Sequence, residues 1–197
     1  MKSIEEVSEW IKSRRSLYPA QMQEDAKIPD EDIWKLLENA NYAPSHKRTE
    51  PWRYIVFADE AKHEMIDKMV EIFLKITPGM DKESDRTKKL LKRKNTLSHI
   101  VAICMNRDEQ KRIPEFEEEY AVACSVQNIL LSMNALNIIG YWSTGKITFT
   151  PEMKSYLNLG DKDKCLGFLL LGVPKPGLPL APKQQMSSIE NKVVWRK

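Results

Sequence analysis

"PEFEEEYAVACSVQNILLSMNALN", residues 114–137, gives the strongest helix prediction in the chain. Its first turn, Glu115 to Glu119, is acidic, and negative side chains stabilise the positive end of a helix. Apolar side chains then recur on more than one face, at Tyr120, Val122, Ala123, Val126, Ile129, Leu130 and Met133. This pattern predicts a helix buried in the centre of the fold. We interpret Gly140 as the left-handed residue that ends it.

Three apolar segments on either side of this helix predict buried strands. They are "WRYIVFA" (52–58), "HIVAICM" (99–105) and "CLGFLLLGV" (165–173). Apolar spacing and capping residues predict further helices: residues 4–11, a helix that Asp30 caps and Pro44 stops, one that Asp59 caps and that breaks near Pro78, and a short one that Thr150 caps ahead of Pro151. Because strands and helices do not alternate regularly, the sequence predicts the α+β class.

The totals indicate one domain, residues 1–197, since this length suits a single sizeable core. The formal charge of +3 is too small to indicate nucleic acid or an anionic membrane as a partner, although a local cluster could hold a small anion. The opening "MKSIEEVSEW" does not resemble a signal peptide, and no segment approaches the roughly 20 apolar residues of a membrane span. We therefore expect a cytoplasmic protein.

The cysteines and histidines do not predict a disulfide framework or a metal site. Three scattered cysteines with apolar neighbours are expected to be reduced thiols in the core: Cys104, Cys124 and Cys165. The three histidines are too far apart in sequence for metal-ligand spacing: His46, His63 and His99.

Familiar catalytic motifs are absent as well. The sequence has no GxSxG and no GxGxxG. "GYWSTGKI" (140–147) has the glycine spacing and lysine of a phosphate-binding P-loop, but Ile147 occupies the magnesium-binding Ser/Thr position. It also follows a helix where a P-loop follows a strand, so we exclude that interpretation.

A basic segment and a proline-rich tail complete the pattern. Residues 81–95 hold seven Lys/Arg and three Asp/Glu, which is typical of a solvated helix or mobile loop. A nucleic-acid-binding module is a rival interpretation, although no aromatic residues interleave with these charges. Residues 174–197 are predicted to form an extended arm whose apolar end, "VVWRK", pairs as an edge strand or joins a neighbour's sheet.

Three short polar segments are candidates for ligand binding. "SRRS" (13–16) combines two guanidinium groups with two hydroxyls, a composition that suits a phosphate. "PSHKRTEPWRYIVF" (44–57) places His46 among charges just before a predicted strand. "YWSTG" (141–145) offers an aromatic pair, two hydroxyls and a glycine where backbone amides can be exposed. Each is weak alone, and their combination and order are informative.

That order resembles the FMN-dependent nitroreductase family, and most of all its short members. The resemblance runs from about Ile11 to Lys175 and includes these segments: "SRRS", "ANYAPSHKRTEPWRYIVF" (40–57), "AVACSVQNILLSMNALNIIG" (121–140), "YWSTG" and "LGFLLLGVPK" (166–175). It implies an α+β fold with a central, mostly antiparallel sheet flanked by helices. It also implies a homodimer that exchanges its C-terminal arms and binds two FMN molecules at the subunit interface.

The implied activity is hydride transfer from NAD(P)H, through flavin N5, to an electron-poor small molecule such as a nitroaromatic or a quinone. The chemistry resides in the flavin, so no catalytic side chain is expected. An alternative of a different class is a flavin-binding protein that stores FMN or senses redox state without turnover.

The resemblance also implies the binding residues. Arg14, Arg15 and Ser16 would hold the FMN phosphate and ribityl chain. Tyr42 and His46 would reach the flavin of the other protomer. Trp142, Ser143, Thr144 and Gly145 would lie beside the ring, with a backbone N–H of Thr144 or Gly145 facing N5. The basic segment 82–94 would lie near the ring as a mobile lid.

The sequence departs from larger family members at three positions. Arg48 and Glu50 stand where those members keep neutral amides, and Tyr18 stands where a basic residue is common near the flavin pyrimidine. The resemblance therefore leaves the source of that charge open, with Arg48 or His46 as candidates. It likewise leaves open whether Lys192 or Arg196 meets the phosphate.

Overall fold

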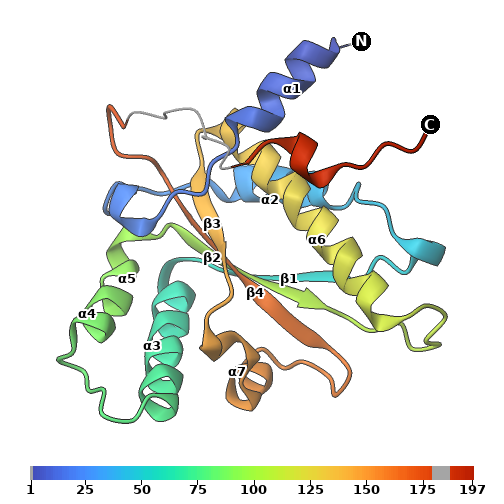
Figure 1. Ribbon diagram of the computed structural model, residues 1–197. Helices are drawn as coiled ribbons and strands as arrows, with labels where there is room; N and C mark the ends of the chain where they lie inside the picture. Colours follow the sequence, from blue (N-terminus) through green and yellow to red (C-terminus); the bar gives the residue numbers. More distant parts are fainter. Residues whose placement is uncertain (1, 179–186) are drawn as a thin grey trace.

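The computed structural model describes residues 2–178 and 187–197. Four strands form one antiparallel sheet in the order β1-β2-β4-β3 (Figure 1). Their bounds are β1 Trp52–Phe57, β2 His99–Met105, β3 Ile139–Ser143 and β4 Lys164–Gly172. Every residue of the central strand β2 is buried, which explains why its sequence is apolar at every position after His99.

Helices cover both faces of this sheet. The α-helices are α1 Ile4–Ser13, α2 Asp30–Ala40, α3 Asp59–Ile76, α4 Asp85–Leu91, α5 Arg93–Thr96, α6 Glu115–Ser132 and α7 Pro151–Tyr156. Short 3₁₀ turns are η1 Pro19–Gln21, η2 His46–Arg48, η3 Met133–Leu136, η4 Lys146–Phe149 and η5 Ile189–Lys192. Figure 1 shows α2 and α6 on one side of the sheet and α3 and α7 on the other. None of the helices in the described part of the chain is long and apolar enough to cross a membrane.

Alternation along the central strands builds two core layers. Val101 and Ile103 of β2 pack with α2 and α6, whereas Ile100 and Ala102 pack with α3 and α7. Successive side chains of a strand point to opposite faces, so one apolar strand serves both layers. The predicted α+β class, with an antiparallel sheet between helices, is confirmed.

Strand β3, which the sequence did not predict, shows that the prediction around Gly140 is wrong. The helix begins as predicted but ends at Ser132, and after η3 it is Asn137 that adopts the left-handed conformation, with φ 51° and ψ 36°. Gly140 lies inside β3, where a Cβ atom would come within 2.3 Å of the Leu170 carbonyl oxygen. Its glycine therefore permits close strand pairing and does not terminate a helix.

Helix α6 is buried on one face only, in contrast to the prediction of a fully buried helix. Val122, Val126 and Ile129 pack on the sheet, but Phe116 and Tyr120 are exposed, Tyr120 at 63%. The prediction that all three cysteines lie in the core is also only partly right. It is right for the two buried cysteines, Cys104 and Cys165, and wrong for Cys124, which is exposed on the outer face of α6.

Two predicted helix caps are displaced by one residue. Pro29 and Ala58 occupy the N-cap positions of α2 and α3, and neither helix has a side-chain cap. Asp30 and Asp59 are instead the first residues of those helices. The Thr150 cap of α7 is confirmed, since its side chain accepts a hydrogen bond from the Met153 N–H.

The structure bears on two predictions that the sequence left open: whether residues 81–95 form a helix or a loop, and whether the tail pairs with its own sheet. Residues 81–95 are mostly helical, forming α4 and α5 against α3. Among the described residues of the tail, residues 193–197 form no strand and extend past α6, exposed to solvent (Figure 1). They are therefore not an edge strand of their own sheet, and pairing with a neighbour's sheet stays a prediction.

Candidate functional site

A cavity of about 800 Å³, here called the basic cleft, lies where β3 leaves the sheet. Residues 143–148 form one wall. The opposite wall comes from α4 and α5, and the floor from α3 and β4. The apolar floor consists of Met69, Phe73, Phe168 and Leu170. The cleft thus combines an apolar floor with polar walls, the usual character of a small-molecule site.

The arginine-rich turn runs beside the strand that leads to this cleft. The Leu17 N–H donates to the Gly140 carbonyl oxygen at 3.1 Å. The Tyr18 ring contacts the Tyr141 ring, with their centroids 4.8 Å apart. Because β3 continues directly into residues 143–145, the structure brings the predicted turn and the predicted loop onto one edge of the sheet.

The members of the turn point in different directions. The Arg14 guanidinium donates to the Ser16 hydroxyl at 3.4 Å. The Arg15 guanidinium turns back to the carbonyl oxygens of Lys12 and Arg14, at 2.5 and 2.8 Å, and lines a separate cavity between α1 and α6. In the single chain, Arg14 and Ser16 thus act as a pair, and Arg15 secures the end of α1.

Tyr42 and His46 lie away from the basic cleft of their own chain. Tyr42 is 86% exposed, and His46 in η2 places its Nδ1 2.6 Å from the Glu117 carboxylate at the start of α6. Trp142 also faces away, because its side chain packs in the layer of α2 and α6 and donates to the Leu166 carbonyl oxygen at 2.9 Å. Of the four residues predicted to lie beside the ring, Trp142 does not line the cleft, whereas Ser143, Thr144 and Gly145 do.

Four basic side chains face the cleft, and the sequence identified only the segment that supplies three of them. Arg86 and Lys89 come from α4, Arg93 from α5, and Lys146 from η4. No lining residue among the described ones is acidic. Neither Arg48 nor His46, the candidates for a charge near the flavin, lines this cleft.

An orphaned hydroxyl lies in the wall of the cleft. Thr148 is 2% exposed, and its Oγ1 has no hydrogen-bond partner among the described residues. A buried hydroxyl without a partner costs on the order of 1–3 kcal/mol. Nearby, a Cβ atom added to Gly145 would meet nothing within 4 Å, so space is open beside that backbone. Both features fit a ligand that supplies a polar atom here.

A second polar cluster lies outside the cleft, at the start of β2. His99 is buried, with Nδ1 2.9 Å from the Ser98 hydroxyl and Nε2 3.1 Å from the Asp30 carboxylate. Burial lowers the pKa of His99, and this outweighs the opposing effect of Asp30. We treat the cluster as part of the scaffold that joins α2 to the sheet.

Comparison with known proteins agrees with this architecture. The nitroreductase family model matches residues 11–173. "Putative NAD(P)H nitroreductase YfhC" of Bacillus subtilis is 30% identical over 169 residues, which cover 83% of this chain and 82% of that protein.

Two solved structures share the fold. The nitroreductase-like family protein from Bacillus cereus superposes with a TM-score of 0.82 at 21% identity, covering 100% of this chain and 99% of that one. A mutant of the FMN and NADPH-dependent nitroreductase NfnB from Sphigopyxis sp. strain HMH gives a TM-score of 0.75 at 14% identity, covering 96% and 98%. Because the family model matches most of the length of this chain, the chain belongs to the nitroreductase family.

Proposed function

We propose that this protein is an FMN-dependent oxidoreductase that passes hydride from NAD(P)H, through flavin N5, to an electron-poor acceptor such as a nitroaromatic or a quinone. Family membership supports the proposal, as do the names of a relative, an NAD(P)H nitroreductase, and of a structural neighbour, an FMN and NADPH-dependent nitroreductase. The proposal needs no nucleophile or metal from the protein, because the cofactor supplies the chemistry when bound.

The observation that most supports FMN binding is the orphaned Thr148 hydroxyl in a cleft with an apolar floor and basic walls. A flat aromatic ring with polar edges satisfies all three features. Phe73, Phe168 and Leu170 would contact its faces. Thr148 would gain the hydrogen bond that it lacks, and Arg93, the least exposed of the wall cations in this part of the chain, would provide positive charge.

The remaining binding residues have roles consistent with their positions. Arg14 and Ser16 would hold the phosphate at the upstream end of the same sheet edge, with charge-assisted hydrogen bonds. The backbone N–H groups of Thr144 and Gly145 would lie beside the ring, where the absence of a side chain at Gly145 leaves room for close approach.

We further propose that the protein is a homodimer in which Tyr42 and His46 of each chain reach the partner's cleft. Several apolar side chains that are exposed in the single chain support this: Ile4, Val7, Trp10 and Ile11 of α1, Phe116 and Tyr120 of α6, and Val193, Val194 and Trp195 of the tail. Helix α1 has no buried residue at all, although it is strongly amphipathic by sequence. A second copy would cover these exposed side chains, since large exposed apolar patches mark protein–protein interaction sites.

Reconstitution tests the cofactor site directly. Titrating the flavin-free protein with FMN should give saturable binding of one FMN per chain. The Thr148→Val variant keeps the shape of the side chain but loses the hydroxyl, so FMN affinity should fall about five- to tenfold, the worth of one hydrogen bond. The unfolding free energy of the flavin-free protein should hold or rise, because an unsatisfied group is removed.

Thr148→Ser is the matched control, since it keeps the hydroxyl and should keep most of the FMN affinity. Equal affinity in the valine variant and in the wild type would remove Thr148 from the cofactor site.

A further inference from the structure

Building on the proposed function, we propose that the basic cleft recognises an anionic group, a carboxylate, sulfonate or phosphate, on the molecule that exchanges hydride with the flavin. The occupant would be a flat apolar molecule with a negative substituent, favoured over neutral analogues of the same shape.

Pairing of the basic residues in the segment 82–94 separates two groups. Three lysines form ion pairs: Lys88 with Glu83 at 3.0 Å, Lys92 with Glu24 at 3.0 Å, and Lys94 with Asp67 at 2.6 Å. Lys89 and Arg93, which face the cleft, form no side-chain ion pair or hydrogen bond within the described residues. The carboxylates thus neutralise three lysines that do not line the cleft and leave the inward Lys89 and Arg93 uncompensated.

The opposite wall adds to this charge. Lys146, in η4, also has no side-chain ion pair or hydrogen bond among the residues described. Arg86 lies over the Phe73 ring, with its guanidinium carbon 5.6 Å from the ring centroid. Four cations from three elements thus converge on one cavity, although the whole chain has a formal charge of only +3. A cleft lined by one sign of charge raises the local concentration of ligands of the opposite sign.

The four cations differ in burial, and this difference indicates which would contact the cofactor and which the substrate. Arg93 is half-buried, whereas Arg86, Lys89 and Lys146 are exposed. The deeper Arg93 suits the flavin, as proposed above, and the oxidised flavin ring itself is neutral. Three cations therefore remain at the mouth, above the apolar floor, for the molecule that lies over the ring.

Two sources could supply the anion: the acceptor, for example a nitrobenzoate, or the 2′-phosphate that distinguishes NADPH from NADH. Each enters a different half of a ping-pong reaction, so the two sources separate kinetically. The first arm compares kcat/KM for 4-nitrobenzoate and the neutral 4-nitrobenzamide. The second arm compares kcat/KM for NADPH and NADH.

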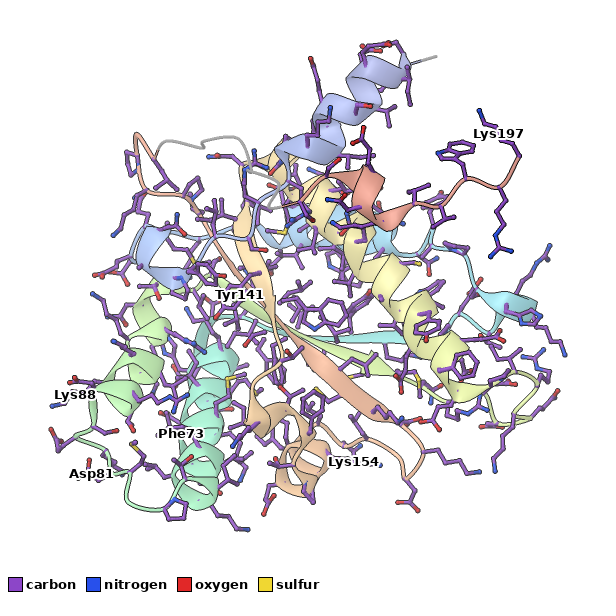
Figure 2. All side chains as sticks on the ribbon, viewed as in Figure 1. Phe73, Asp81, Lys88, Tyr141, Lys154 and Lys197 are labelled. Atoms are coloured by element: carbon purple, nitrogen blue, oxygen red, sulfur yellow. The ribbon has the colours of Figure 1, made fainter. Side chains whose placement is uncertain are left out.

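The variant is the double exchange Lys89→Gln with Lys146→Gln. The matched control is Lys88→Gln, because Lys88 belongs to the same helix, α4, but lies at the outer edge of the molecule (Figure 2) and pairs with Glu83. In at least one arm, the wild type should prefer the more anionic member of the pair, 4-nitrobenzoate or NADPH, at low ionic strength. The double variant should lower that preference about tenfold, or about 1.4 kcal/mol, which is within the range expected for the loss of two exposed charge interactions. The control should leave it unchanged.

Binding of the probe itself gives a readout without turnover. Calorimetric titration of the purified protein with 4-nitrobenzoate and 4-nitrobenzamide, with and without FMN, should show tighter binding of the anion to the wild type than to the double variant. Added salt should reduce that difference.

These measurements distinguish the two proposals. If the protein neither binds FMN nor accepts hydride, the proposed function fails, and the calorimetric comparison still decides the charge preference. If the double variant matches the wild type in both kinetic ratios and in binding, anion recognition is overturned even with the oxidoreductase activity intact.

Discussion

Leu17 donates its backbone N–H to the carbonyl oxygen of Gly140 at 3.1 Å, which ties the arginine-rich turn to β3. Three residues farther along, β3 ends and the wall of the basic cleft begins. Gly140 also approaches Leu170 too closely to carry a side chain. One short strand therefore positions both the phosphate-binding candidates and the ring-binding candidates.

Gly140→Ala should disturb the pairing of β3 with β4. The added Cβ would lie 2.3 Å from the Leu170 carbonyl oxygen, so β3 must move away from β4. We expect the unfolding free energy to fall by about 1–3 kcal/mol, the usual cost of overpacking, as measured by chemical denaturation of the flavin-free protein. Gly145→Ala is the control for stability, because its Cβ would meet nothing within 4 Å. Equal stability of the two variants would contradict the close packing at Gly140.

Arg14→Ala should weaken FMN binding more than Arg15→Ala. Arg14 pairs with Ser16, whereas the Arg15 guanidinium already donates to two carbonyl oxygens at the end of α1. Loss of a charge-assisted hydrogen bond of about 1.5–3 kcal/mol corresponds to a roughly 10- to 100-fold weaker FMN affinity for Arg14→Ala. Fluorescence titration with FMN measures both variants. Unchanged FMN retention in the variant lacking both arginines would refute the role of this turn.

The apolar tail should be required for dimerisation. Trp195 is 81% exposed in the single chain, and Val194 is similarly exposed. Val194→Asp combined with Trp195→Ala should raise the dimer dissociation constant about tenfold or more, as expected for a buried aromatic anchor. Sedimentation velocity over a concentration series measures this. Phe149→Ala removes an exposed aromatic of η4, next to α7 and away from the tail, and should leave the dissociation constant unchanged. A monomeric wild type would contradict the homodimer.

His99 should make the protein less stable in mild acid. Its folded-state pKa lies below the ordinary value of 6.5, mainly because of burial, so the unfolded chain binds the proton more readily. The stabilisation from neutral His99 is full above pH 6.5 and is lost as the pH falls through the folded-state value. In denaturation curves recorded at several pH values, His99→Gln should flatten this dependence, and His63→Gln controls for the loss of a histidine. An identical pH profile for His99→Gln and wild type would contradict this effect.

The sequence predicted those elements that can be recognised from their local pattern of apolar residues, without knowledge of tertiary packing. β2 and β4 are almost continuously apolar after their first residue, because both faces of each strand are covered along most of its length. β3 was missed because it is five residues long, contains Gly140 and closely follows a long helix. The exposed face of α6, with Phe116 and Tyr120, has the same apolar pattern as its buried face, and no property of a single sequence separates a core contact from a surface that a partner would cover.

The candidate site was predictable to a similar extent. Ser143, Thr144 and Gly145 were identified by motif, and they do line the cleft. The inward charges could not be chosen from seven basic residues, because that choice depends on how α4 and α5 pack and on which lysines find carboxylates elsewhere in the chain. The orphaned hydroxyl of Thr148 likewise has no sequence pattern, since it results from tertiary packing.

Anaerobic mixing of the FMN-loaded protein with NADPH, and separately with NADH, tests the central claim most directly. The visible absorption of the oxidised flavin should bleach with at least one nucleotide and return when a quinone or a nitroaromatic compound is added. Tight FMN binding without bleaching by either nucleotide would contradict an oxidoreductase and indicate a flavin-storing or redox-sensing protein.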